Sequence, residues 1–235
     1  MQLPISNGTG NYEIEPSKII ALGLNYQAHI KESLSVKVRG LDENVPSEPV
    51  LFNKLSSSVI GPDQEIVLPA IVDEYGFDEP RTDHEAELAV IIGAPGKNIP
   101  AERAFDYIYG FTCANDVSQR NIQNGDRSGW FRGKSFDTFC PLGPVVVPVS
   151  VLPNVQDLGV VCRVNGETRQ QGRTSQMIFS VAETIAFVSR NFSLKSGDVI
   201  LTGTPSGVAP LASGDVVEVE IEGIGTLKNR VTKEG

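Results

Sequence analysis

The chain has 235 residues, 40% of them hydrophobic, which favours one large domain with a sizeable core. Its net charge of −9 and the lack of a Lys/Arg cluster argue against DNA or RNA as partners. No apolar run approaches the ~20 residues of a membrane helix, and the first residues do not resemble a signal peptide. We therefore expect a cytoplasmic protein with no membrane partner. Three widely spaced cysteines without a CxxC motif indicate buried free thiols, not disulfides or a zinc site.

The N-terminal part of the chain predicts an extension, a strand and a short helix. Residues 1–16 are rich in Gly, Asn and Ser, and we expect them to form a short extension. The remaining residues, 17–235, are expected to form a single catalytic domain. A strand over residues 19–23 leads to Asn25, which can cap a short helix over about 26–33.

The segment after this helix is polar and long. Residues 35–49 mix Ser, Lys, Asp, Glu, Asn and Pro, and together with the helix they form a candidate lid over residues 26–49. The elements expected after it are a strand at 49–54, a loop at 71–83, a strand at 85–92, a helical turn or two at 100–107, a strand at 108–114, an irregular stretch at 117–139 and a strand at 145–147.

Local signals are clearest in the last third of the chain. The dipeptide Asn165-Gly166 favours a two-residue hairpin turn. Ser180 and Glu183 form a capping box for a helix whose apolar stripe begins at Val181. Strands are expected at 160–164, 167–169, 199–201 and 217–221. Many strands, few helices and no alternation of strand and helix predict a strand-rich α+β fold and not a doubly wound sheet.

Two glutamates lie two residues apart at the start of a predicted strand. On a strand, Glu85 and Glu87 point to the same face. The following residues, 88–92, are all apolar, so we expect the strand to be buried on both faces. A buried carboxylate is costly unless it is paired or metal-bound, and this strand carries no Lys or Arg. We interpret the pair as metal ligands; a solvated strand face, as expected for Glu218 and Glu220, is the alternative.

A third carboxylate can complete this site. Asp116 follows the apolar strand over residues 108–114, where a turn or cap role is the alternative. Carboxylate oxygens suit Mg²⁺, Mn²⁺ or Ca²⁺ and disfavour zinc and copper. With only two histidines, the chain cannot build a His-rich metal site. We therefore expect a hard divalent cation, with Mg²⁺ favoured.

Two further features could take part in chemistry. His29 and Glu32 are three residues apart on the predicted helix, where a carboxylate would orient the imidazole and raise its basicity. A surface ion pair of little consequence is the alternative. His84 is expected to face away from Glu85 and to be structural. The stretch from Thr202 to Gly207 is a glycine-rich turn whose amides could hold a carboxylate, or it could be only a turn.

These residues belong to seven stretches that follow one another in the order seen in one known family. Between about residues 17 and 232, the chain resembles the fumarylacetoacetate hydrolase family. It departs from the pattern at Leu24 and Asn121, where some members have Arg and Asp. The matching stretches are Gly23-Leu24-Asn25-Tyr26 with His29 and Glu32, Asp83 to Leu88, Asn115 to Ser118, Gly133 to Thr138, Pro141 to Pro144, Val164 to Glu167 and Leu201 to Val208.

The resemblance implies a fold and a set of site residues. The family fold is a β-sandwich roll of mixed sheets with a few short helices, and it is commonly a homodimer. The implied cofactor is Mg²⁺, with Mn²⁺ or Ca²⁺ as alternatives. The resemblance assigns the metal to Glu85, Glu87 and Asp116 with Thr138 beside it, catalysis to His29, Glu32 and Lys134, and substrate binding to Gln123, Gly203 and Thr204.

The resemblance also implies an activity. Members act on small 2-oxo acids and 1,3-dicarbonyl acids through a metal-bound enolate, and hydrolysis of the C–C bond of an acylpyruvate is the favoured expectation. The alternatives are isomerisation of 2-hydroxyhepta-2,4-diene-1,7-dioate, decarboxylation of oxaloacetate, and tautomerisation. A metal-binding protein without enzymatic activity is a further alternative. Its mark would be the loss of His29, Glu32 or Lys134, and all three are present.

Overall fold

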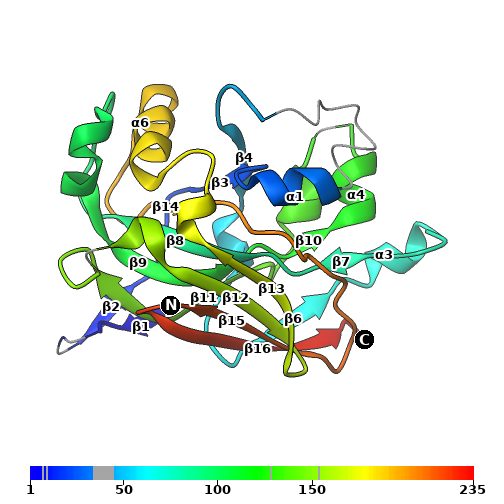
Figure 1. Cartoon of the computed structure of the whole chain (residues 1–235). Helices are drawn as coiled ribbons and strands as arrows, with labels where there is room; N and C mark the ends of the chain where they lie inside the picture. The colour runs from blue at the N-terminus through cyan, green and yellow to red at the C-terminus, as the bar shows by residue number, and fades with distance from the viewer. Residues whose placement is uncertain (7, 9, 34–44, 128, 153) are drawn as a thin grey trace.

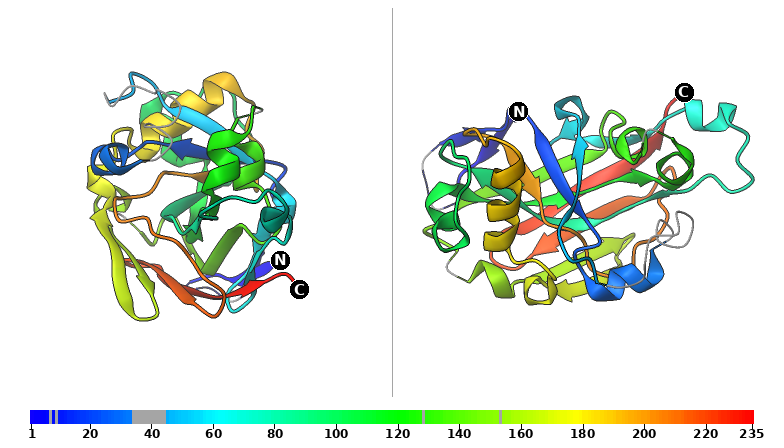
Figure 2. Two further views of the ribbon diagram at one scale, coloured as in Figure 1. Left: turned by 90° about the vertical axis from the view of Figure 1, so that its right-hand side faces the viewer. Right: turned by 90° about the horizontal axis from the view of Figure 1, so that it is seen from above.

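The computed structural model describes residues 1–6, 8, 10–33, 45–127, 129–152 and 154–235. Two β-sheets pack against each other, and Figures 1 and 2 show helices α1, α4 and α6 along one side of the molecule with the smaller sheet on the opposite side. The predicted strand-rich α+β fold is confirmed.

The larger sheet has the strand order β4-β3-β14-β8-β9-β11-β5. All residues of β8 are buried, which confirms that this strand is covered on both faces. Its antiparallel register with β9 pairs Glu87 with Ala114, so the start of β8 lies beside the end of β9. The strands are β3 (Ile19–Gly23), β4 (Val50–Lys54), β5 (Val59–Ile60), β8 (Ala86–Ile92), β9 (Ile108–Asn115), β11 (Cys140–Pro148) and β14 (Val199–Leu201).

The second sheet has the strand order β13-β12-β15-β16-β6. The predicted hairpin between β12 and β13 is confirmed, and both turn residues, Asn165 and Gly166, have the positive φ that this turn requires. Val217, Val219 and Ile221 of β15 are buried, whereas Glu218 and Glu220 on its other face are partly exposed, as expected. The strands are β6 (Glu65–Leu68), β12 (Gly159–Val164), β13 (Glu167–Arg173), β15 (Val216–Ile221) and β16 (Gly225–Lys233).

Short helices and two small strand pairs complete the fold. The capping box of α6 is confirmed by reciprocal hydrogen bonds between Ser180 and Glu183. Within the described ranges, no helix is long and apolar enough to span a membrane. The helices are α1 (Gln27–Glu32), α3 (Ile71–Glu74), α4 (Arg120–Gly125), α5 (Phe131–Lys134) and α6 (Val181–Asn191), with 3₁₀ turns η1 (Ser56–Ser58), η2 (Ala101–Tyr107), η3 (Val155–Asp157) and η4 (Thr174–Gln176). The small pairs are β1 (Gln2–Pro4) with β2 (Asn11–Glu13) and β7 (Thr82–Asp83) with β10 (Ser118–Gln119).

Several local predictions are corrected. The stretches 71–83 and 117–139 contain α3, α4, α5 and the pair β7–β10, although they were expected to be a loop and an irregular segment. These helices are only four to six residues long, too short to show an apolar period. The N-cap of α1 is Tyr26, and not Asn25. The Asn25 side chain instead donates to the Thr202 and Phe179 carbonyls at 2.8 and 3.1 Å, so tertiary contacts use its cap-forming group.

The N-terminal extension and the lid are described in part. Residues 1–16 contain the β1–β2 pair, and Leu3 within β1 and Ile14 directly after β2 are buried in the core. Of the predicted lid over residues 26–49, the structure describes α1 and residues 45–49, whereas residues 34–44 lie outside the described part.

The two faces of β8 pack against different apolar clusters, and this decides on which side of the sheet Glu87 lies. Leu88 and Val90 belong to the core cluster between the sheets, whereas Ala89 and Ile91 belong to a second cluster on the other face of the larger sheet. Glu87 is two residues before Ala89 and therefore lies on the face of the second cluster. The site thus forms where this apolar face ends.

Candidate active site

Three carboxylates meet where β8 begins and β9 ends. Glu85 directly precedes β8, Glu87 is its second residue, and Asp116 directly follows β9. The Asp116 N–H donates a hydrogen bond of 2.8 Å to the Glu85 carbonyl, which joins the two segments. One oxygen from each carboxylate lies within 4.8 Å of the others, and all three residues are buried. The structure thus brings together the three predicted metal ligands.

Buried cations from distant parts of the sequence surround two of these carboxylates. Arg120 Nη2 lies 2.6 Å from Glu85 Oε1, and Lys134 Nζ lies 2.5 Å from Glu85 Oε2. Lys134 Nζ is also 2.7 Å from Asp116 Oδ2, while Lys54 Nζ is 2.6 Å from Asp116 Oδ1. The strand itself carries no Lys or Arg, as the sequence shows, and the cations that balance Glu85 and Asp116 come from β4, α4 and α5.

These contacts keep both the carboxylates and the cations in their charged forms. Burial alone would raise the pKa of Glu85, but Arg120 and Lys134 lower it well below its usual range, so Glu85 is ionised. Burial alone would lower the pKa of Lys134, but Asp116 and Glu85 raise it, so the ammonium group stays charged. Full charges therefore face one another on buried side chains, where electrostatic interactions are stronger than in water.

Glu87 is the exception in this cluster. It makes no ion pair with any residue that the structure describes, and the hydrogen bond recorded for its carboxylate comes from the Gly203 N–H, at 2.6 Å. Burial, and then repulsion from Asp116 and Glu85, raises the pKa of Glu87 well above its usual value. A buried carboxylate with so little compensation is costly in free energy.

The donor set fits a hard divalent cation. The candidate ligand atoms are all carboxylate oxygens, which Mg²⁺, Mn²⁺ and Ca²⁺ prefer. A cation held by Glu85, Glu87 and Asp116 would supply the positive charge that Glu87 lacks. The residues present therefore fit the predicted class of metal.

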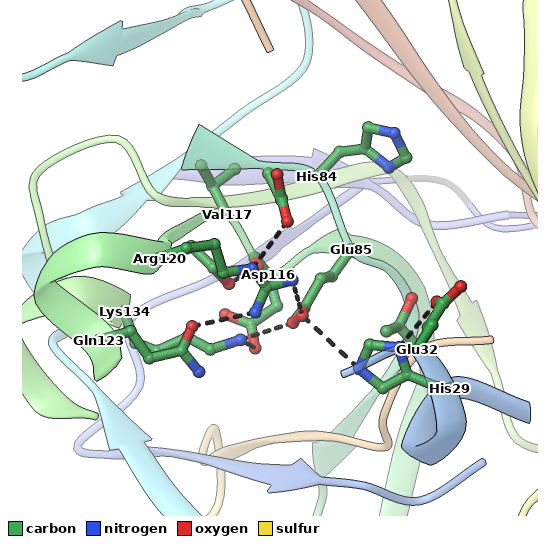
Figure 3. A network of polar contacts seen from close by, with 12 residues as sticks. His29, Glu32, His84, Glu85, Asp116, Val117, Arg120, Gln123 and Lys134 are labelled. Carbon is green, nitrogen blue, oxygen red and sulfur yellow. Dashed lines mark hydrogen bonds and ion pairs between the residues drawn. The ribbon is translucent and has the colours of Figure 1, made fainter. Parts of the chain in front are cut away.

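A histidine–glutamate pair on α1 faces these carboxylates (Figure 3). His29 Nδ1 lies 3.1 Å from Glu32 Oε1, and His29 Nε2 lies 3.9 Å from Glu85 Oε1. The Gly207 N–H donates to both Glu32 oxygens, at 2.8 and 3.1 Å. Burial alone would raise the pKa of Glu32, but the hydrogen bonds from His29 and Gly207 lower it, so Glu32 is an ionised acceptor. The predicted contact between His29 and Glu32 is confirmed.

The glycine-rich turn after β14 serves two carboxylates of the protein itself. Gly203 and Gly207 have φ angles of +93° and +98°, which side chains other than hydrogen rarely permit. Their N–H groups donate to Glu87 and Glu32. Of the two alternatives for this turn, the structure therefore supports carboxylate binding, although the carboxylates belong to the chain.

Thr204 is fixed by a buried glutamine from the second sheet. Thr204 Oγ1 donates to the Ala86 carbonyl at 2.8 Å and accepts from Gln170 Nε2 at 2.7 Å. Gln170 Oε1 in turn accepts from the Ala86 N–H at 3.0 Å. The Thr204 hydroxyl proton is therefore engaged by the strand that carries the glutamates.

A small polar chamber of about 20 Å³, the inner chamber, lies inside this cluster. Gly203 contributes its N–H to Glu87 and does not line the chamber. Thr138 does not line the chamber either, and its Oγ1 accepts from the Val67 N–H at 2.8 Å, so we leave it out of the proposed site. The predicted site residues that line the inner chamber are His29, Glu85, Glu87, Gln123, Lys134 and Thr204.

His84 points away from Glu85, as predicted (Figure 3). Its Nδ1 lies 2.9 Å from Gln170 Oε1, and its Nε2 has no partner among the described residues. Because Gln170 Oε1 also accepts from a backbone N–H, it acts as the acceptor, and His84 carries its proton on Nδ1. Burial lowers the pKa of His84, so it is neutral and structural.

Sequence reasoning missed four residues of this site. Lys54, Arg120 and Gln170 are buried and contact the carboxylates or Thr204, and Asp83 receives hydrogen bonds from Arg120 and Arg81. Asp83 lies in a stretch that shares a motif with the family, but the motif does not show its partners. The i,i+3 spacing of Arg120 and Gln123, whose side chains are 2.9 Å apart, was the available signal.

The chain is similar to known proteins over most of its length. Residues 18–232 match the profile described as the C-terminal part of fumarylacetoacetate (FAA) hydrolase. A human mitochondrial oxaloacetate tautomerase is 43% identical over 92% of this chain and 67% of its own length.

Solved structures show the same similarity. A 5-carboxymethyl-2-hydroxymuconate delta-isomerase from Mycobacterium smegmatis is 42% identical, with a TM-score of 0.81 over 94% of this chain and 81% of that one. A fumarylpyruvate hydrolase from Pseudomonas aeruginosa, in complex with Mn²⁺ and pyruvate, is 30% identical, with a TM-score of 0.86 over 100% of this chain and 96% of that one. The chain therefore belongs to the fumarylacetoacetate hydrolase C-terminal family of enzymes.

Proposed function

We propose that the chain is a divalent-metal-dependent enzyme that interconverts the keto and enol forms of a small 2-oxo acid such as oxaloacetate. The observation that carries this proposal is the position of His29. One ring nitrogen contacts Glu32, and the other faces the inner chamber, 3.9 Å from Glu85. The similarity to a human protein named oxaloacetate tautomerase supports the same reaction.

The charged residues of the inner chamber suit a 2-oxo acid. Glu85, Glu87 and Asp116 would hold the metal, which would act as a Lewis acid on the 2-oxo group. Lys134, held by Glu85 and Asp116, adds positive charge where negative charge develops on the 2-oxo oxygen. Gln123 lines the same chamber and is oriented by Arg120 Nη1, 2.9 Å from Gln123 Oε1.

The histidine–glutamate pair determines where the proton goes. Because Glu32 is an ionised acceptor, the Nδ1–H of His29 donates to it, and in the neutral imidazole the free electron pair is on Nε2. His29 Nε2 removes a proton from C3 of the substrate, the C–H electron pair forms the C2–C3 double bond, and the 2-oxo oxygen takes the negative charge. Return of the proton from His29 to that oxygen gives the enol, and the reverse sequence gives the ketone.

The test is the rate at which freshly dissolved enol-oxaloacetate converts to the ketone, followed by its ultraviolet absorbance with Mg²⁺ or Mn²⁺. We expect His29→Asn to lower the enzymatic rate ~100-fold or more while the affinity for Mn²⁺ is retained. Lys31→Ala, an exposed neighbour on α1, is the matched control and should keep the wild-type rate. A wild-type rate in His29→Asn would overturn the role of His29, and no enzymatic rate in the wild type would overturn the reaction.

Hydrolysis of a C–C bond is a second candidate, which the sequence alone favoured. The similarity to the Pseudomonas fumarylpyruvate hydrolase extends over nearly both whole chains, and a cavity of about 150 Å³ beside His29 has room for water. The same His29 nitrogen could take a proton from that water. Release of pyruvate from acetylpyruvate or fumarylpyruvate separates the two reactions, because tautomerisation leaves the carbon chain intact.

A further inference from the structure

A second cavity, the outer chamber, adjoins the inner chamber. It has a volume of about 150 Å³, and both cavities are lined by His29, Ser33 and Arg120. The inner chamber, at about 20 Å³, has room for little more than one small group. A substrate whose 2-oxo end reaches the carboxylate cluster is larger than the inner chamber, and the outer chamber, which shares three lining residues with it, has room for the rest.

Most charged groups that line the outer chamber are already engaged. Glu32 accepts from His29 and Gly207. Arg120 uses Nε on Asp83, Nη1 on Gln123 and Nη2 on Glu85. Both Asp83 oxygens are also used, because Oδ1 lies 2.7 Å from Arg81 Nε and Oδ2 lies 2.8 Å from Arg120 Nε.

Arg81 differs from these groups. Its Nε is anchored to Asp83, but its terminal nitrogens have no hydrogen-bond partner in the part of the chain that the structure describes. Its side chain is 36% exposed, whereas that of Asp83 is 1% exposed, so Arg81 stands between a buried anchor and solvent. Its backbone is fixed as well, because its N–H donates to Asn121 Oδ1 and its carbonyl accepts from the Arg120 N–H, both at 2.8 Å.

A guanidinium group held by Nε presents its remaining N–H donors in a planar fork that matches a carboxylate. In a chain with a net charge of −9, a dianionic substrate also needs such local positive charge. We propose that Arg81 is a specificity-determining residue that binds the distal carboxylate of a short dioic 2-oxo acid in the outer chamber. This inference rests on the proposed function, since it assumes that the 2-oxo end of the substrate occupies the inner chamber.

The test compares two substrates that differ at the distal end. Oxaloacetate carries a carboxylate there, and acetylpyruvate carries a neutral acetyl group. We expect Arg81→Gln to raise the KM for oxaloacetate ~10- to 100-fold with kcat nearly unchanged, because a charged hydrogen-bonded contact is lost from both ground and transition states. The KM for acetylpyruvate should change less than about twofold. Arg81→Lys keeps the charge without the fork and should lie between Arg81→Gln and the wild type.

Controls separate this role from a structural one. Arg103→Gln removes an exposed arginine on η2, which pairs with Asp106 and lines neither chamber, and should leave both KM values unchanged. Equal losses for the two substrates in Arg81→Gln, or no loss for either, would overturn the inference while leaving the tautomerase proposal in place.

A binding measurement keeps the two proposals distinguishable. Titration calorimetry with oxaloacetate and Mg²⁺ is done on His29→Asn and on the double variant His29→Asn/Arg81→Gln. Weaker binding of oxaloacetate in the double variant, with acetylpyruvate binding unchanged, supports the role of Arg81 even if the wild type shows no turnover. Equal affinities for oxaloacetate in both proteins, or no binding to either, would reject it.

Discussion

Lys54 and Asp116 form an ion pair of 2.6 Å in which both side chains are completely buried. The Lys54 ammonium group also donates to the carbonyls of Val117 and Lys134, so all of its three protons have acceptors. The last residue of β4 therefore holds a carboxylate beyond the end of β9 and the end of α5. This pair joins three segments of the candidate site.

Replacing Lys54 should destabilise the folded protein, because this ion pair joins three segments. We expect Lys54→Met to lower the free energy of unfolding by ~3–5 kcal/mol, because Asp116 would remain buried without this partner. Urea denaturation measures the change. Lys228→Met, at an exposed pair 3.3 Å from Glu218, is the control and should cost at most ~1 kcal/mol. A similar small cost for Lys54→Met would contradict the structural role of the buried pair.

Glu87 should be needed for metal binding, and its buried carboxylate should lower the stability of the metal-free protein. In Glu87→Gln, the amide oxygen can still accept from Gly203, and the buried charge without an ion pair is removed. We expect the variant to have a Tm in chelator equal to or above that of the wild type, and to lose the rise in Tm that Mg²⁺ or Mn²⁺ produces.

Differential scanning fluorimetry with and without metal checks this pair of effects. Glu102→Gln, an exposed residue of η2, should behave as the wild type does in both conditions. A metal-dependent rise in Tm that persists in Glu87→Gln would place the cation elsewhere.

Gln170 should stabilise the candidate site, although it lies on β13 of the second sheet. In Gln170→Leu, the Ala86 N–H and His84 Nδ1 would lose their acceptor and stay buried. We expect a loss of at least ~2 kcal/mol in urea denaturation. Gln171→Leu, the exposed neighbour on β13, should change stability by less than ~0.5 kcal/mol. Equal stability of the two variants would show that the buried hydrogen bonds are not needed.

The capping box of α6 should make a pH-dependent contribution. Hydrogen bonds from Ser180 lower the pKa of Glu183 in the folded chain below its value in the unfolded chain. The contribution is therefore complete above the unfolded pKa and is lost as the pH falls through the lowered folded pKa. We expect Glu183→Ala to cost ~1 kcal/mol at pH 7 and progressively less toward pH 3. Urea denaturation across this range measures it, and a cost independent of pH would argue against an ionised Glu183 in the capping box.

The cysteines should be chemically silent in the folded protein. Burial raises the pKa of the thiols of Cys113, Cys140 and Cys162 to about 12, so the reactive thiolate is scarce below that pH. We expect no alkylation by iodoacetamide at pH 8 in native buffer and complete alkylation in denaturant, as measured by mass spectrometry. Rapid alkylation of the native protein would mean that one of these thiols is accessible.

Features governed by near neighbours in the chain could be predicted. Three such features depend on residues at most three positions apart. They are the shared face of Glu85 and Glu87, the turn at Asn165-Gly166 and the capping box at Ser180. They were read correctly because backbone geometry alone decides which of these groups meet.

Other features of the site depend on residues far apart in the chain. Asp116 forms ion pairs with Lys54 and Lys134, and Thr204 accepts a hydrogen bond from Gln170. No spacing rule links these residues, so the sequence could show that the carboxylates needed a positive charge but not which residues supply it. Only the packing of β4, α4, α5 and β13 around the start of β8 decides that two carboxylates have a protein cation and that Glu87 has none among the described residues. The reason is that ion pairs and hydrogen bonds act over a few ångströms in space, whatever the separation along the chain.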